Sequence, residues 1–448
     1  MTLIHRRLLY GFFFLLFFLL APFIILISEG YQIDWQHFRF QKTGVLFLES
    51  KPNNADIYLN DQKVKNQTTA RLKNLAPAEY LVTLKKEGYF AWTKKLRVYP
   101  GNTTFAQYIR LFKENIFSEK IITEKIKVFS PEINRQMAFI AADASVIKLF
   151  LFDFDKGQTK EITTLNFLPQ EIIMAENGNH FLLNDGAAWW LLTREFLGGN
   201  QLKKISTASA TQIKKIAFHP RNPTEIFELS NLGFRHLDTT TEKITILIPA
   251  NVADFYLSSD KIYYIKNNST QTELLSFVYD QPDTAQLETT LLAGTYAFAP
   301  GHDPFLCLLE KTKNNFYLFQ QANQKLNLKE NTFADVTKII WHPNGQAFLF
   351  GNDFELWVYD NSRPENKKQL IIRLGSPIQG FWWYPIQTHV LFSTPEGLFV
   401  TEVIGNNVVR DTVNFSALKN TSSLWLNDKG DKIYWLDKEN NFFVSQIQ

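Results

Sequence analysis

The sequence predicts an all-β protein with one N-terminal transmembrane helix, a small β-sandwich and a β-propeller of four-stranded blades. Three observations lead to this fold class. An uncharged apolar run covers residues 8–27, hydrophobic alternation with a period of two covers 43–112, and a repeat of about 40 residues fills 116–448. Aromatic residues make up 15% of the chain, which favours strands because such side chains fit a pleated, half-buried surface.

The composition excludes several classes of protein. The 448 residues carry a net charge of only +3 without a strongly basic stretch, so nucleic acid is not an expected partner. The single cysteine, Cys307, excludes an intrachain disulfide framework and a zinc cluster built from cysteines. It lies in an apolar run at 305–309, where we expect an inert, buried thiol.

The run at 8–27 has the length that a helix needs to cross the hydrocarbon core of a bilayer. Arg6 and Arg7 precede it, and the positive-inside rule then places residues 1–7 in the cytosol and the rest of the chain outside. No small-residue cleavage site follows the run, so we expect a retained, single-pass anchor in the cell membrane rather than a cleaved signal peptide. A buried core helix is the third interpretation. Residues 28–42 are expected to form a linker.

Residues 43–112 alternate between apolar and polar side chains, and turn-forming residues such as Pro100-Gly101 separate the alternating segments. The pattern predicts four or five short strands in a small β-sandwich.

This segment also resembles a PEGA domain, whose tetrapeptide stands here as Pro52-Asn53-Asn54-Ala55. The residues that carry the resemblance are Pro52, Ala55, Pro77, Tyr80, Gly88 and Tyr89. The chain departs from the family at Ala78, where a glycine is expected. The resemblance implies a surface-exposed module of the bacterial cell envelope without enzymatic activity.

An aromatic or apolar residue, which we call the anchor residue, recurs in residues 116–448 at intervals of 37 to 45 residues. The anchor residues are Phe129, Met174, Phe218, Phe255, Phe298, Trp341, Trp383 and Trp425. A turn and three further strand-like segments follow most of them, which is the period of a propeller blade. The spacing predicts eight blades. Because the copies at 174 and 255 are weak, seven blades plus an irregular unit is the alternative.

The last copy lacks a fourth strand, whereas a spare strand at 119–123 precedes the first copy. We expect this segment to complete the last blade and to close the ring, because an open ring would leave unpaired strand edges. The turns at Ser130-Pro131-Glu132 and at 342–345 resemble those of TolB-type, or WD40-like, propeller repeats.

No linear catalytic motif is present, so we expect no enzyme, no catalytic residue, no metal site and no cofactor. His219 and His342 share one repeat position and are interpreted as turn residues. The pair His302-Asp303 lies between two prolines and is interpreted as two polar residues of a loop. The pairs 189–190 and 382–383 are tryptophans, which indicate either sugar platforms or, more commonly, core rings.

These observations favour a membrane-anchored, extracytoplasmic binding or scaffold protein of the cell envelope. The lipid bilayer contacts residues 8–27, and the propeller is the recognition platform for a protein or a glycan. A propeller enzyme with a non-linear active site in the central channel and a purely structural wall component are the alternatives.

Overall fold

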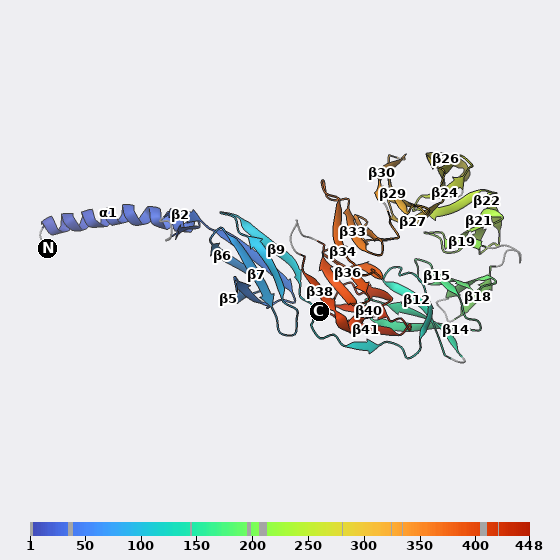
Figure 1. Ribbon diagram of the computed structural model, residues 1–448, viewed down its shortest axis with the longest axis horizontal. Helices are drawn as coiled ribbons and strands as arrows, with labels where there is room; N and C mark the ends of the chain where they lie inside the picture. Colours follow the sequence, from blue (N-terminus) through green and yellow to red (C-terminus); the bar gives the residue numbers. More distant parts are fainter. Residues whose placement is uncertain are drawn as a thin grey trace. The chain divides into compact units, whose positions relative to one another are not determined.

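The chain folds into two compact units (Figure 1). The N-terminal unit comprises residues 1–117, 404–413 and 446–448, and the propeller unit comprises 118–403 and 414–445. The computed structural model describes residues 3–34, 39–143, 146–194, 199–205, 213–279, 281–323, 325–333, 335–403, 410–419 and 421–448.

The N-terminal unit begins with helix α1 (Leu3–Ser28), which contains the predicted apolar run. Its stretch Ile4–Ser28 has a mean hydropathy of 2.7, and none of it is buried against other parts of the protein. A helix that is apolar on all faces and has no buried residues is not a core helix. Its length exceeds the roughly 30 Å of a bilayer core. A membrane anchor and a signal sequence both fit this helix.

A short hairpin follows the helix, in the region expected to be a linker. Strands β1 (Tyr31–Asp34) and β2 (Arg39–Lys42) pair in antiparallel register. The carbonyl of Gly30 accepts hydrogen bonds from the Thr43 N–H (2.8 Å) and from its Oγ1 (2.7 Å). These two bonds hold the ends of the hairpin together.

Seven strands form the small β domain of the N-terminal unit, two or three more than the sequence predicts. They are β3 (Gly44–Lys51), β4 (Asp56–Leu59), β5 (Gln62–Gln67), β6 (Ala70–Leu75), β7 (Glu79–Lys85), β8 (Trp92–Arg97) and β9 (Thr103–Arg110). One sheet has the order β6-β3-β9, with β9 parallel to β3, and the other has the order β5-β4-β7-β8. The prediction missed strands such as β5, which is polar and mostly exposed and therefore shows no apolar alternation.

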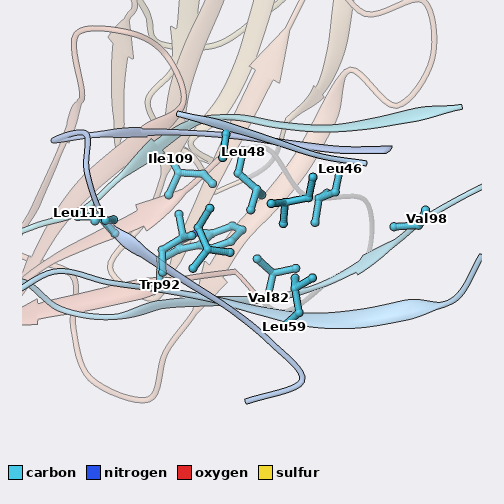
Figure 2. Packing of buried hydrophobic residues seen from close by; sticks show 13 residues of the cluster. Leu46, Leu48, Leu59, Val82, Trp92, Val98, Ile109 and Leu111 are labelled. Carbon is cyan, nitrogen blue, oxygen red and sulfur yellow. The ribbon is translucent and has the colours of Figure 1, made fainter. Parts of the chain in front are cut away.

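The core of this domain lies between the two sheets (Figure 2). Over residues 44–50, strand β3 alternates between buried and half-buried residues, as the period of two predicts for a strand with one face on a core. Leu46 and Leu48 of β3, Val82 of β7, Trp92 of β8 and Ile109 of β9 are buried there.

In the described residues, thirty-two strands in eight four-stranded sheets make up the propeller unit. Those of the first four sheets are β11 (Ile126–Phe129), β12 (Gln136–Ala142), β13 (Ile147–Asp153), β14 (Gln158–Leu165), β15 (Glu171–Met174), β16 (His180–Asn184), β17 (Trp189–Arg194), β18 (Asn200–Lys204), β19 (Ile213–Phe218), β20 (Glu225–Ser230), β21 (Gly233–Asp238), β22 (Ile244–Ile248), β23 (Val252–Leu257), β24 (Lys261–Asn267), β25 (Gln271–Val278) and β26 (Gln281–Leu292). Those of the last four are β27 (Tyr296–His302), β28 (Phe305–Glu310), β29 (Asn315–Ala322), β30 (Lys325–Phe333), β31 (Lys338–Trp341), β32 (Ala347–Gly351), β33 (Glu355–Asp360), β34 (Lys368–Arg373), β35 (Gly380–Trp383), β36 (His389–Thr394), β37 (Gly397–Glu402), β38 (Thr412–Phe415), β39 (Ser423–Leu426), β40 (Lys432–Leu436), β41 (Phe442–Gln446) and β10 (Ser118–Lys120). A single 3-10 turn (Ser416–Leu418) follows β38.

Within each sheet the strands are neighbours in chain order, except in the last sheet, where the early strand β10 takes the fourth place. The first strands of several neighbouring sheets, such as β23, β27 and β31, approach one another, so they form the inner side of the propeller. The fourth strands lie at its outer edge.

The hydrophobic core of the propeller unit lies between consecutive sheets. One cluster, for example, joins Ala138 of the first sheet with Phe181 of the second. Another joins Phe152 of the first sheet with Tyr434 and Phe442 of the last. The first and the last sheet therefore pack against each other.

Strand β10 pairs with β41 in antiparallel register, with Ser118 opposite Ser445 and Lys120 opposite Phe443. The predicted ring closure is therefore confirmed. The paired strand is shorter than the predicted 119–123 and begins one residue earlier. Beyond it, Ile121 adds one further backbone hydrogen bond, from its N–H to the carbonyl of Phe442 (2.9 Å).

Candidate binding surfaces

The residues that carry the PEGA resemblance occupy turns and the domain core. Ala55 is fully buried, and its N–H donates to the hydroxyl of Thr68 (3.0 Å). The carbonyl of Pro52 accepts a hydrogen bond from Ser50 Oγ (2.9 Å). These contacts hold the turn between β3 and β4, and they leave no reactive group at the tetrapeptide.

The second group of PEGA residues behaves in the same way. The Tyr80 hydroxyl donates to the carbonyl of Ala76 (2.9 Å) across the turn that contains Pro77. Gly88 has a φ of +78°, which L side chains rarely adopt, and Tyr89 forms a β-bridge with Lys113. These residues shape the turns of the domain.

The anchor residues of the propeller share one repeat position, but they differ in burial. Phe218 and Trp383 are buried, Phe298, Trp341 and Trp425 are half-buried, and Phe129 is 37% exposed. The shared anchor position predicts that Trp341, Trp383 and Trp425 are all buried between blades, and this prediction is wrong for Trp341 and Trp425, which are half-buried. These residues end the inner strands, where each ring is covered only in part.

Two of the anchor tryptophans make hydrogen bonds between neighbouring sheets. The indole N–H of Trp341 donates to the carbonyl of Pro300 (2.8 Å), and that of Trp383 donates to the carbonyl of Ile340 (3.0 Å). The recurrence of tryptophan at this repeat position is therefore explained by a contact between sheets.

The repeated histidines serve the turns that follow the inner strands. His219 Nδ1 accepts the backbone N–H groups of Arg221 (3.0 Å) and Asn222 (3.1 Å). His342 Nδ1 accepts the N–H of Asn344 (3.2 Å), and its Nε2 lies 3.2 Å from the carbonyl of Pro385. Burial lowers the pKa of His342, which agrees with a neutral ring in this role.

The adjacent pair His302 and Asp303 does not form a catalytic dyad. The Asp303 carboxylate accepts the backbone N–H of Ser259 (2.9 Å), and His302 Nδ1 lies 3.1 Å from the carbonyl of Asp303. Among the described residues, no group of three or more histidine, cysteine or acidic side chains is arranged to hold a metal ion.

The two tryptophan pairs are core elements more than open platforms. Trp189 is buried in the cluster between the second and third sheets. The Trp190 ring lies 5.4 Å from that of Phe167, and its N–H donates to the Asp185 carboxylate (2.7 Å). Trp382 is half-buried, and the ammonium of Lys338 lies 5.4 Å from its ring centre.

Four outermost strands expose large apolar side chains, which the sequence analysis did not predict. The strands β18, β22, β26 and β30 belong to four consecutive sheets (Figure 1). Their exposed apolar residues are Leu202, Ile244, Ile246, Leu287, Leu292 and Leu328. In the described part of the chain, β10, β14, β34 and β38 expose no large apolar side chain. The signal was present in the sequence as the run Ile244-Thr245-Ile246-Leu247-Ile248.

A groove of about 130 Å3 lies between β18 and the start of β22. Ile205, Leu237 and Ile244 contribute its apolar lining. Lys203 forms an ion pair with Glu242 across it (2.5 Å) and donates to the carbonyl of Thr239 (3.2 Å). The groove thus joins the outer edges of two sheets and has an apolar lining with a charged rim.

A second and larger cavity, of about 380 Å3, lies beside the outer strands of the sheet β23–β26. Its lining residues are Asp260, Lys261, Ser276, Phe277, Val278, Thr284, Gln286 and Gln321. They come from the turn before β24, from strands β24, β25 and β26, and from β29 of the following sheet.

A carboxylate that is almost fully buried supports this cavity. The Glu288 side chain is 6% exposed, and its Oε1 accepts hydrogen bonds from Ser276 Oγ (2.6 Å) and Gln286 Nε2 (2.9 Å). The ammonium of Lys261 lies 3.6 Å from the same oxygen. Burial, and secondarily the charge of Glu288, raise the pKa of Tyr263, whose hydroxyl donates to Gln321 Oε1 (3.0 Å).

Comparisons with known proteins agree with this architecture. Residues 43–115 match the PEGA domain family. No curated protein sequence matches the chain. The C-terminal WD40 domain of Sif2 is similar in structure, with a TM-score of 0.50 and 12% identity over 74% of this chain and 99% of that one. A eukaryotic initiation factor is similar too, with a TM-score of 0.51 and 10% identity over 73% of this chain and 91% of that one. At these identities the likeness shows the fold alone: a PEGA domain followed by a β-propeller.

Proposed function

We propose that this protein is a membrane-anchored scaffold of the cell envelope whose propeller binds another protein at its outer edge. The observation that carries the proposal is the exposure of apolar side chains on β18, β22, β26 and β30, compared with their burial or absence on the other four outermost strands. Apolar side chains on an unpaired strand edge favour association with another chain.

Strand β22 is the best candidate for the contact. Ile246 is 57% exposed, and Ile244 is exposed beside it and also lines the groove next to β18. An extended partner segment that pairs with β22 would satisfy the free backbone groups of this edge, and its apolar side chains would cover the two isoleucines. Lys204 at the groove favours a segment that carries an acidic residue, whereas Lys203 is already paired with Glu242.

A photo-crosslinking amino acid at position 246 tests the proposal in cells. We expect crosslinks from this position to a defined envelope protein, and loss of that product when Ile244→Lys is added. The matched control has the photo-crosslinker at the exposed Thr159 of β14, an outermost strand without apolar exposure. Equal products from positions 159 and 246 would refute the proposed docking edge.

The proposed location is extracytoplasmic, with the N-terminus in the cytosol. Arg6 and Arg7 at the start of α1 support this orientation, because basic residues flank membrane helices on the cytosolic side. A reporter fused after Gln448 should be accessible from outside the cell, and the mature chain should keep its first residues. A soluble form that begins near Ser28 would show a cleaved signal sequence instead.

We further propose that the protein is not an enzyme. The support is that side-chain atoms of His219, His342 and Asp303 accept hydrogen bonds from backbone N–H groups in turns. A propeller enzyme remains the alternative. It would require ionisable groups that converge on a substrate in one cavity.

A further inference from the structure

We propose that the 380 Å3 cavity beside Glu288 binds a neutral, polyhydroxylated ligand, namely one or two saccharide units. This site is separate from the protein-binding edge proposed at β22, and neither depends on the other. Its volume lies in the range of small-molecule sites, which run from about 300 to 1,000 Å3.

The chemistry of the lining matches hydroxyl groups, each of which donates one hydrogen bond and accepts others. Acceptors are supplied by the carboxylate of Asp260 and by the hydroxyls of Ser276 and Thr284, and Glu288 lies behind this lining, where it accepts hydrogen bonds from Ser276 and Gln286. Donors are supplied by the ammonium of Lys261 and by the side-chain amides of Gln286 and Gln321. Such a mixture suits a ligand with several hydroxyls better than one with a single charged group.

The polar groups of the cavity are held in place by the protein itself. Asp260 Oδ1 accepts from Ser258 Oγ (3.1 Å), and its Oδ2 lies 3.4 Å from Gln321 Nε2. Gln321 in turn is fixed by the hydroxyl of Tyr263 (3.0 Å). A site whose side chains are already oriented loses less entropy when a ligand binds.

The position of the charges argues for a neutral ligand. Two carboxylates, Asp260 and Glu288, repel an anion, and Lys261 already lies 3.6 Å from Glu288 and would compete with a cation. The contacts of Glu288 fall on Oε1, and Oε2 accepts no hydrogen bond from the described residues. Glu288 therefore acts on the ligand through Ser276, whose hydroxyl donates to Oε1 and can itself accept from a ligand hydroxyl.

An apolar surface completes the cavity. Val278 is 40% exposed and lines the cavity, whereas the ring of the neighbouring Phe277 belongs to the core of its sheet. A C–H face of a sugar ring can pack against the Val278 side chain while its hydroxyls face the polar wall.

The test is a calorimetric titration of the full-length protein in detergent micelles. The ligands are the methyl glycosides of glucose, galactose, mannose and N-acetylglucosamine. A second arm uses the matching disaccharides, which distinguishes a single sugar from a unit of a longer glycan. We expect at least one glycoside to bind, and Glu288→Gln and Ser276→Ala to weaken that binding about tenfold or more. Asp283→Asn, an exposed residue of the same strand outside the cavity, is the matched control and should bind as the wild type does.

Thermal unfolding of each variant separates a damaged site from a damaged fold, because only variants that unfold at the wild-type temperature count. Three results would overturn the proposal. One is the absence of glycoside binding up to about 10 mM. Another is equal binding by wild type and the Glu288→Gln variant. The third is binding of a lysine amide probe in place of the glycosides, which would identify a cation site.

Discussion

The side-chain hydroxyls of Ser118 and Ser445 lie 2.9 Å apart, although 327 residues separate them in the chain. The two serines are directly opposite each other in the pair β10–β41, which is the only strand pair of the propeller unit's described sheets that joins the beginning of the unit to its end. The Trp435 indole N–H also donates to Ser445 Oγ (3.1 Å), so the closing contact is fixed from the adjacent strand.

A disulfide should therefore form in the double variant Ser118→Cys/Ser445→Cys. Directly opposed residues have Cβ atoms about 4.5–5.5 Å apart, and these two side chains already point at each other, so a small shift reaches disulfide geometry. Under mild oxidation we expect a faster-migrating band in non-reducing electrophoresis and a higher unfolding temperature. The chain-entropy model gives about 5–6 kcal/mol for a loop of this size, of which engineered bonds deliver only a part.

The matched control is Glu119→Cys/Ser445→Cys, because residues 119 and 445 point to opposite faces of the sheet. This pair should remain reduced under the same conditions. Oxidation of both pairs to the same extent would indicate that β10 is not held in the observed register.

Much of this fold is predictable from the sequence because the signals are local. The apolar run at 8–27 specifies a helix by its length, and the recurrence of aromatic residues such as Trp341 and Trp383 marks the end of successive inner strands. Closure through β10 was predictable from a count of strands. Strands of the small domain such as β5 were not, because β5 is polar on both faces and shows no period of two.

The candidate sites could not be predicted from the sequence, for a different reason. The cavity beside Glu288 brings together Asp260, from the turn before β24, and residues of β24, β25, β26 and β29; Asp260 and Gln321, which are in contact, are 61 residues apart. No spacing rule links such residues. The exposure of Ile244 and Ile246 also depends on the position of β22 at the outer edge, since the same residues in a central strand would be buried.

The second prediction concerns the anchor tryptophans, which differ in burial. Trp383→Ala should destabilise the protein by about 3–5 kcal/mol, the usual range for a buried aromatic, because it creates a cavity and removes the bond to the Ile340 carbonyl. Trp341→Ala should cost less because Trp341 is half-buried. Urea unfolding of the detergent-solubilised chain measures both, and Trp383→Phe separates the ring from the N–H. An equal loss for the two alanine variants would contradict the burial difference.

The third prediction concerns acid stability. Burial lowers the pKa of His342, so below the usual histidine pKa of about 6.5 the unfolded chain binds a proton that the folded chain excludes. The free energy of unfolding should therefore fall as the pH drops below about 6.5, and His342→Asn should lose part of this dependence. Each unit by which the pKa is lowered corresponds to about 1.4 kcal/mol. Unfolding curves at pH 8, 7, 6 and 5 measure it, and parallel losses in both proteins would contradict it.

The last prediction concerns the only thiol of the chain. Cys307 is fully buried on β28, where Phe305, Phe316 and Leu318 surround it, and burial raises its pKa. The thiol should therefore resist maleimide labelling at pH 8 in the folded protein and react promptly in denaturant, because the thiolate is the reactive form and the folded state disfavours it. A Thr159→Cys variant in a Cys307→Ala background is the control, and its exposed thiol should react at once without denaturant.

The same raised pKa of Cys307 means that above about pH 8.5 the unfolded chain releases a proton that the folded chain keeps, so this thiol lowers the free energy of unfolding as the pH rises. Cys307→Ala should remove that share of the alkaline loss. Rapid labelling of the native protein would show that β28 does not lie in the core of its sheet.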